Sequence, residues 1–206
     1  MKKITSDVLL NYLDEMYENP TCELNYSKDY ELLIATVLSA QSTDKRVNMV
    51  TKELFSNYDI FEIANLESDI LEEMIKPVGT FRKKAIFVKE ICKKLIKDYN
   101  GKVPNNRTYL ESLPGVGRKT CNVVLSHLFM EPAIAVDTHV ERVSKRLKIA
   151  YKDDTPLEVE NKLMKMIPKE KWAKTHLQMV LFGRYHCKSV KPNCSDCKIK
   201  DFCIKK

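Results

Sequence analysis

Long apolar runs are missing from this chain of 206 residues. No stretch approaches the roughly 20 apolar residues that a helix needs to cross a bilayer. Residues 1–7 include two lysines, but acidic residues interrupt the apolar stretch that follows, so this segment does not resemble a signal peptide. We therefore expect a cytoplasmic protein.

Signals for β-structure and for flexible linkers are also scarce. No segment has the pattern of a β-hairpin turn, and the only strand-like run, residues 134–136, is short enough to be a connector. The chain has no Gly/Ser-rich linker, low-complexity tract or obvious repeat, so any two domains must pack closely. Because nearly every periodic segment has helical spacing, the predicted fold class is all-α.

Several segments carry the helical pattern clearly. Ser6 is placed to cap a first helix. Residues 30–38 are apolar nearly all round, which predicts a helix at the centre of the core. Residues 85–99 have apolar positions at spacings of three and four, and the Asn-Gly pair 100–101 is expected to end that helix. Residues 155–158 combine an N-cap threonine, a proline at the first helical position and a capping-box glutamate.

The charged residues are unevenly distributed. The net charge is +7, which suits a polyanionic partner but is equally consistent with a merely basic protein. Between Arg82 and Lys97, seven basic residues stand against one acidic residue, Glu90, whereas residues 59–73 are acidic. This polarised distribution favours an electrostatic binding surface.

Cysteines are concentrated at one end of the chain. Three of the seven are scattered, whereas four lie within the last 20 residues. These four are Cys187, Cys194, Cys197 and Cys203, with the spacing C-x6-C-x2-C-x5-C. A cytoplasmic chain has little use for disulfides, so the group indicates a metal site. Four thiolates bind either zinc or an iron–sulfur cluster. Zinc sites usually pair two short knuckles, and only one is present here. The lysines around the cysteines could offset the negative charge of a cluster or contact phosphate.

The most informative segment is Leu-Pro-Gly-Val-Gly-Arg-Lys-Thr, residues 113–120. Helical patterns precede and follow it, so two helices are joined by a tight turn. Gly115 and Gly117 permit backbone angles that other residues resist, and they leave no side chain to block an anion. Backbone amides at the start of the second helix would attract phosphate. This is the helix-hairpin-helix pattern, which grips the DNA backbone; the alternative is a plain corner between two helices.

Two residues have the character of a catalytic pair. Lys119 lies in the first turn of the second helix, beside Arg118. The positive end of the helix and the charge of Arg118 both disfavour a charged lysine amine. A neutral amine is what Schiff-base chemistry needs, although a lysine is more often a solvated surface charge. Asp137 follows a short apolar run and precedes a helix, which makes it an N-cap and leaves one carboxylate oxygen for a second role.

Taken together, these motifs resemble the endonuclease III family of helix-hairpin-helix DNA glycosylases. The resemblance runs from Leu24 to Cys203 and includes residues 38–44, 113–120 and 136–139 with the cysteine spacing. It implies that Lys119 is the nucleophile, that Asp137 assists it and that the four cysteines hold a [4Fe-4S] cluster. It also implies that Gln41 fills the gap left by an extruded base.

Further contacts follow from the same resemblance. The residues expected to contact DNA are Gln41, Thr80, Phe81, Gly115, Val116, Gly117, Arg118 and Lys191. The residues expected near the substrate pocket are Ser39, Asp44 and His139. Relatives often carry a bulky apolar wedge directly after the glycine at Gly79, whereas here Thr80 stands there and Phe81 follows, so Phe81 is expected to take part of that role.

The implied architecture has two helical lobes. One spans residues 22–131 and carries the hairpin at 107–130; the other combines residues 1–21 and 132–206 and holds the cluster at 187–203. A flipped-out base would reach Lys119 and Asp137 in a cleft between the lobes.

The expected activity is removal of oxidised pyrimidines from duplex DNA, followed by β-elimination at the abasic site. We expect a monomeric base excision repair enzyme, nucleoid-associated in a prokaryote. Two alternatives stay open: a mismatch-specific glycosylase of the same superfamily, and a non-catalytic iron–sulfur module that binds DNA or senses redox state.

Overall fold

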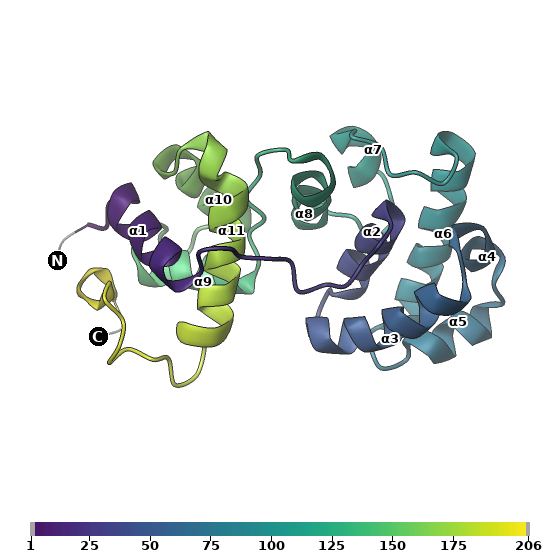
Figure 1. The fold of residues 1–206 in the computed structure, drawn as a ribbon, viewed down its shortest axis with the longest axis horizontal. Helices are drawn as coiled ribbons and strands as arrows, with labels where there is room; N and C mark the ends of the chain where they lie inside the picture. Colours follow the sequence, from purple (N-terminus) through teal and green to yellow (C-terminus); the bar gives the residue numbers. More distant parts are fainter. Residues whose placement is uncertain (1–2, 205–206) are drawn as a thin grey trace. The chain divides into compact units, whose positions relative to one another are not determined.

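The computed structural model describes residues 3–204, and in that range it contains helices and no β-strand (Figure 1). The predicted all-α fold class is therefore confirmed. The chain divides into two compact units, Cys22–Phe129 and Met1–Thr21 with Met130–Lys206. We call the first the continuous unit and the second the composite unit. None of the helices within residues 3–204 combines the length and the hydropathy of a membrane span.

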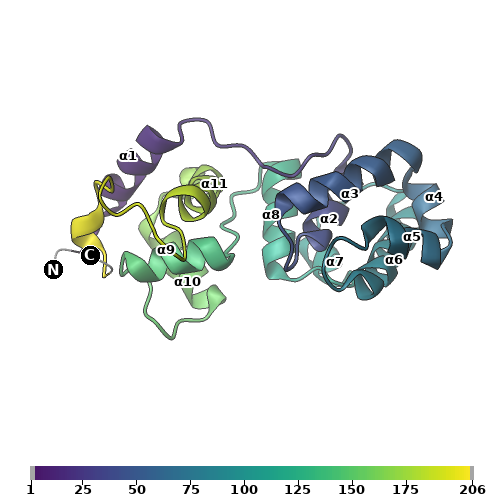
Figure 2. The same cartoon turned by 90° about the horizontal axis from the view of Figure 1, so that it is seen from below.

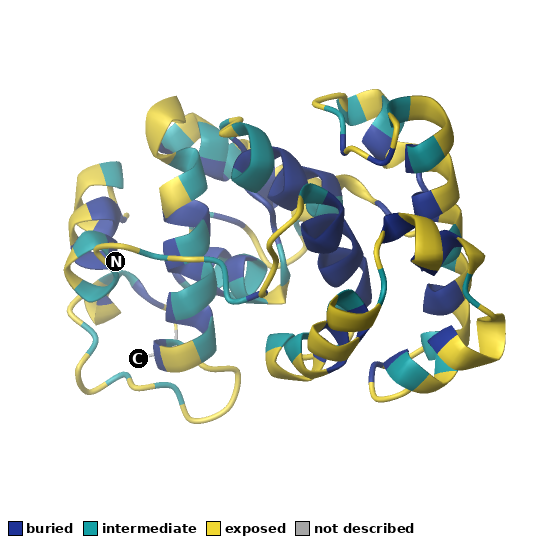
Figure 3. Cartoon of the chain, turned by 45° about the vertical axis from the view of Figure 1, so that its right-hand side comes forward, coloured by how far each residue is buried: buried dark blue, intermediate teal, exposed yellow. Residues whose placement is uncertain are grey.

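The continuous unit is built around one buried helix. Its helices are α2 (Asp29–Leu38), α3 (Asp44–Asn57), α4 (Ile60–Asn65), α5 (Ser68–Ile75), α6 (Phe81–Tyr99), α7 (Arg107–Glu111) and α8 (Arg118–Phe129). Every residue of α2 from Tyr30 to Leu38 is buried, and α2 contacts α3, α6 and α8. Figure 3 shows the buried residues on the inner faces of the helices and the exposed ones outside. The expectation of a central helix at 30–38 is confirmed.

The composite unit is assembled from both ends of the chain. Its elements are α1 (Ser6–Met16), α9 (Thr138–Arg146), α10 (Pro156–Met166), a 3₁₀ turn (Lys169–Lys171), α11 (Trp172–Leu181), a π-helix (Phe182–His186) and a second 3₁₀ turn (Lys200–Phe202). Helix α11 contacts α1 and α9, as Figure 2 shows. The Phe182 ring meets Tyr12 of α1 edge-on, with ring centroids 5.9 Å apart. Packing against α11 therefore joins the N-terminal helix to the C-terminal segment.

Local signals in the sequence set most helix ends. The Thr155 hydroxyl and the Glu158 carboxylate form the expected capping box of α10. Helix α6 ends at Asn100, which has a left-handed backbone, and Gly101 follows with φ +80°. The expected cap of the first helix is wrong by one position: Thr5 caps α1, and Ser6 is its first residue. Thr5 and Ser6 both carry a hydroxyl that can cap a helix. An N-cap residue has a non-helical backbone, and Thr5 has the extended one.

Candidate functional site

The predicted hairpin is formed by α7, α8 and the turn between them. Val116 is buried in the core of the continuous unit, and its N–H donates to the Leu113 carbonyl oxygen at 3.1 Å. The Cys121 N–H donates to the Gly117 oxygen at 2.9 Å, which joins the turn to the start of α8. The turn is thus fixed from both sides by backbone hydrogen bonds, whereas Gly115, Gly117 and Arg118 are exposed.

The two glycines of this turn have different roles. Gly115 has φ +77°, and a Cβ atom there would lie 2.5 Å from the Phe87 ring, so both backbone and space require glycine. Gly117 does not have a positive φ, so the expectation that it needs a special backbone angle is wrong. A Cβ on Gly117 would meet nothing within 4 Å. In residues 3–204, no backbone carbonyl accepts the N–H of Gly115 or Gly117, and both residues are exposed.

Lys119 is half-buried at the second position of α8. Burial raises the pKa of the Cys22 thiol, Asp44 adds to that rise, and Lys119 opposes it. Burial lowers the pKa of His127, two turns further along α8, and the charge of Lys119 contributes to that shift. The Lys119 amine therefore lies within electrostatic range of Cys22 and His127. Asp44, expected near the pocket, is also within range of Cys22 and is the first residue of α3.

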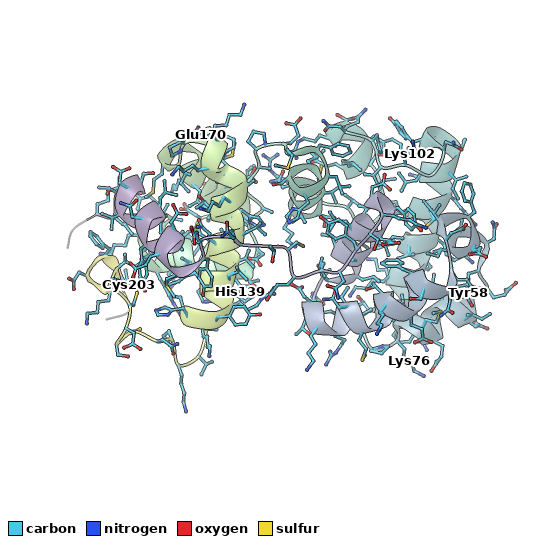
Figure 4. All side chains as sticks on the ribbon, in the orientation of Figure 1. Tyr58, Lys76, Lys102, His139, Glu170 and Cys203 are labelled. Carbon is cyan, nitrogen blue, oxygen red and sulfur yellow. The ribbon has the colours of Figure 1, made fainter. Side chains whose placement is uncertain are left out.

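Asp137 caps α9 in the composite unit, as predicted. Its Oδ1 accepts hydrogen bonds from the His139 and Val140 N–H groups, each at 2.8 Å. Both bonds go to one carboxylate oxygen, so the geometry leaves Oδ2 for another partner. His139 is half-buried on the first turn of the same helix, where Figure 4 labels it.

Helix α9 also holds the start of the cysteine segment through Arg142. The Arg142 Nε donates to the Cys187 carbonyl oxygen at 3.2 Å, and its Nη2 donates to the Gly183 oxygen at 2.6 Å. The same Nη2 lies 3.2 Å from His139 Nδ1. Glycine at position 183 lets the π-helix lie close to the first turn of α9, because a Cβ on Gly183 would lie 2.7 Å from the Cβ of His139. Helix α9, which Asp137 caps, is thereby joined directly to the first cysteine.

Arg146, one turn further along α9, continues this attachment. Its Nη1 donates to the Cys187 Sγ at 3.2 Å and to the Lys188 oxygen at 2.7 Å. Its Nη2 donates to the Ser189 oxygen at 3.1 Å. Neither arginine is predicted from the sequence as a functional residue. Their i, i+4 spacing places both on one helix face, but it does not indicate what that face meets.

The four cysteines line one pocket, together with Arg146, Phe182 and His186. About 350 Å³ of this pocket is empty of atoms, including space open to solvent. None of the four forms a disulfide. Burial raises the pKa of the Cys197 thiol, and the nearby Tyr12 hydroxyl opposes that rise. Within the described residues, no three His, Cys, Asp or Glu side chains form a group that could hold a metal ion. Figure 4 labels Cys203 in this segment.

The chemistry of the pocket fits a thiolate-bound cluster. All four cysteines line the same cavity and can supply four thiolates. The Arg146 guanidinium, which donates to the Cys187 sulfur, is the kind of outer contact that stabilises a thiolate ligand. The pocket adjoins the short 3₁₀ turn Lys200–Phe202, through which the chain reaches Cys203.

Two adjacent turns of the continuous unit carry other predicted contacts. Gln41 and Thr80 are exposed, with φ +57° and +56°. Phe81 is half-buried and packs against the core, so Thr80, not Phe81, is the exposed residue at the wedge position. The Ser39 hydroxyl donates to the Thr36 oxygen at 2.8 Å within its own helix end.

The basic residues are less uniformly exposed than the sequence suggests. Lys84, counted in the basic run of α6, is only 3% exposed and does not contribute to a surface. Lys198, beside Cys197, forms an ion pair with Glu15 of α1. Lys191 is exposed in the cysteine segment, with φ +49°. Lys205 and Lys206 lie outside the described residues.

Comparison with known proteins gives a consistent result. Residues 34–169 match the model of the HhH-GPD superfamily base excision DNA repair proteins. Endonuclease III of Bacillus subtilis is 48% identical over 197 residues, which cover 94% of this chain and 89% of the relative.

Solved structures agree with the sequence relatives. A trapped endonuclease III–DNA covalent intermediate matches with a TM-score of 0.93 at 50% identity, covering 96% of this chain and 93% of that chain. A non-covalent endonuclease III–DNA complex matches with a TM-score of 0.94 at 49% identity, covering 98% of this chain and 96% of that chain. This chain therefore belongs to the endonuclease III family of the HhH-GPD superfamily.

Proposed function

We propose that this protein is a bifunctional DNA glycosylase and AP lyase of base excision repair. It removes oxidised pyrimidines from duplex DNA and then cleaves the abasic strand. The observation that carries this proposal is the half-buried Lys119 in the first turn of α8. It directly follows a turn with two exposed glycines whose N–H groups have no backbone acceptor in residues 3–204. The relative trapped as a covalent intermediate with DNA supports a covalent mechanism for the family.

Lys119 is proposed as the nucleophile. Its neutral amine attacks the sugar C1′ as the bond from C1′ to the base breaks, and the base leaves with a proton. Asp137, with Oδ1 occupied by the α9 amides, presents Oδ2 to the positive charge that develops on the sugar. The C1′–O4′ bond of the sugar ring then breaks, O4′ takes up a proton, and the amine nitrogen forms a second bond to C1′. The resulting Schiff base acidifies C2′. Loss of a proton there expels the 3′ phosphate and breaks the strand.

The hairpin turn is proposed to hold the DNA backbone. Gly115 and Gly117 are exposed, their N–H groups have no backbone acceptor in residues 3–204, and we propose that these groups donate to phosphate. Buried Val116 fixes the turn in the core. Gln41 is proposed to enter the gap left by the extruded base, with Thr80 beside it. Arg118 and Lys191 add positive charge near the backbone. His139, Ser39 and Asp44 are proposed to surround the pocket.

The four cysteines are proposed to hold a [4Fe-4S] cluster. When bound, such a cluster supplies a rigid cross-link among four thiolates, and its role here is structural and DNA-positioning. Protein purified without oxygen should be brown and contain about four irons per chain. One zinc per chain, without visible absorbance, would contradict the proposal.

The activity is tested with duplex oligonucleotides. One set carries an oxidised pyrimidine, a second a G·T mismatch, a third an abasic site, and a fourth is undamaged. We expect base release and a nick on the first set, and a nick on the third. Release of thymine from the mismatch alone would instead favour the mismatch-specific alternative. Binding to every duplex without release of any base would favour the non-catalytic module.

A further inference from the structure

Two turns of the continuous unit hold side chains in an unusual backbone conformation. Gln41 and Thr80 both have a left-handed backbone, which non-glycine residues adopt rarely and only where the surroundings enforce it. The Gly79 N–H donates to the Ser42 Oγ at 3.1 Å, so the two turns are hydrogen-bonded to each other. The surface that carries Gln41 therefore depends on contacts that hold both turns.

The buried side chain of Lys84 provides such contacts. Lys84 is 3% exposed, and its ammonium donates to the Leu38 oxygen at 2.9 Å and to the Ala40 oxygen at 2.7 Å. Burial lowers the pKa of Lys84, in keeping with a cation taken out of water. Its partners in these bonds are backbone carbonyls rather than a carboxylate, which is an uncommon way to bury a lysine.

Each of these bonds acts at a defined place. Leu38 is the last residue of α2, so the ammonium lies at the negative end of that helix and satisfies a carbonyl that has no donor within the helix. Ala40 directly precedes Gln41. The Lys84 N–H donates to the Thr80 oxygen at 3.1 Å, so Lys84 is bonded to both turns.

We propose that Lys84 is a positioning residue for Gln41. Its buried ammonium holds the turn at 39–43 so that Gln41 keeps its left-handed backbone beside Thr80 and its side chain can enter the gap in the duplex. The part played by Gln41 in DNA rests on the proposed function. The fixing of the turn by Lys84 does not, and the two claims are tested separately.

The first test measures amide hydrogen exchange in the protein without DNA. In Lys84→Met, whose side chain has similar length and no donor, exchange in residues 39–43 should be faster by about tenfold or more, because the substitution removes both hydrogen bonds of the ammonium. The control is Lys52→Met, which removes the same charge from an exposed position on α3 and should leave this segment unchanged. Equal exchange in wild type and Lys84→Met would overturn the proposal.

The second test is a double-mutant cycle with Gln41→Ala, measured as affinity for a duplex with an abasic-site analogue. If Lys84 acts through Gln41, Lys84→Met should weaken binding about tenfold in the wild type and less than about twofold in Gln41→Ala. Additive effects would assign Lys84 a merely structural part and overturn the positioning role. If Lys84→Met does not fold, both tests use Lys84→Gln, whose shorter side chain does not reach both carbonyls. A wild type that releases no base would contradict the proposed function but leave the exchange test valid.

Discussion

In the continuous unit, backbone hydrogen bonds fix the residues around Lys119, whereas in the composite unit arginine side chains fix those beyond Asp137. Val116 and Cys121 hold the hairpin turn through main-chain bonds. Arg142 and Arg146 instead reach from α9 to the oxygens of residues 183–189 and to a cysteine sulfur. The main-chain hydrogen bonds of the hairpin turn form without any bound group. The arginine contacts surround a pocket lined by four thiols, and their order is expected to depend on what those thiols bind.

The contrast separates two kinds of dependence in the proposed enzyme. Lys119, the proposed nucleophile, and the turn proposed to bind phosphate belong to a unit with a continuous core around α2. Asp137, which is proposed to stabilise charge, caps a helix that is hydrogen-bonded to the cysteine segment. Changes near Lys119 should therefore act on chemistry or DNA contact directly, whereas changes near Asp137 can also act through the cysteine segment.

The largest expected effect concerns Lys119 and tests the chemical role of the continuous unit. Borohydride should trap wild type on lesion DNA, and Lys119→Ala should form no adduct and nick at least about 10³-fold more slowly. Binding to DNA should persist, because the proposed contact with phosphate uses the backbone amides of Gly115 and Gly117 and not the lysine side chain. Lys102→Ala, an exposed lysine of the same unit, is the control and should trap normally. Undiminished trapping in Lys119→Ala would assign the nucleophile to another amine.

Salt dependence measures how the two units share the binding of phosphate. A handful of lysine–phosphate pairs should lower affinity on the order of 10³-fold between 50 and 200 mM salt. One double variant replaces Lys93 and Lys94 of α6 by glutamine, and a second replaces Lys188 and Lys191 of the cysteine segment. In each variant, the slope of the logarithm of the binding constant against the logarithm of the salt concentration should become shallower by about 0.9 for every replaced lysine that pairs with a phosphate. Undamaged duplex should show a similar slope with weaker binding. Affinity that ignores ionic strength would refute a phosphate-based grip.

Asp137→Asn separates capping from catalysis in the composite unit. Asparagine caps nearly as well as aspartate, so the melting temperature should stay near that of wild type. Turnover on lesion DNA should fall about 10²-fold, because the neutral side chain does not stabilise charge on the sugar. The matched control is Asp59→Asn, which changes the N-cap aspartate of α4 in the other unit and should keep full activity. Full activity in Asp137→Asn would leave Asp137 as a cap only.

The sequence predicted those features that depend on neighbouring residues. The hairpin string, the capping box at 155–158 and the end of α6 each require only a few consecutive side chains, and the structure has all three. The cap of α1 was misplaced by one residue because Thr5 and Ser6 offer the same hydroxyl.

Features formed by distant residues could not be read in this way. A lysine in a basic run, such as Lys84, is expected at the surface. The burial of Lys84 depends on carbonyls that lie 44 and 46 residues earlier in the chain. Arg146 likewise finds its sulfur partner 41 residues later. No periodicity or local motif records such pairings, because they follow from tertiary packing of helix ends and irregular segments.

The smallest expected effects distinguish the two glycines of the hairpin turn. Gly115→Ala should lower the free energy of unfolding by about 1–3 kcal/mol, because its φ of +77° and the Phe87 ring both oppose a methyl group. Gly117→Ala should change it by less than about 0.5 kcal/mol, since the added carbon meets nothing within 4 Å.

For Gly117→Ala, the expected loss of DNA affinity is large relative to the expected loss of stability. In Gly117→Ala, a methyl group would stand where a phosphate approaches the turn, so binding should weaken about tenfold while the fold is unchanged. Phe87→Leu combined with Gly115→Ala should recover only part of the missing stability, because the ring clash is relieved and the backbone strain is not. Chemical unfolding and binding to undamaged duplex measure the two quantities independently. Unchanged binding in Gly117→Ala would show that phosphate does not approach this glycine, and the grip would then have to use other amides of the turn.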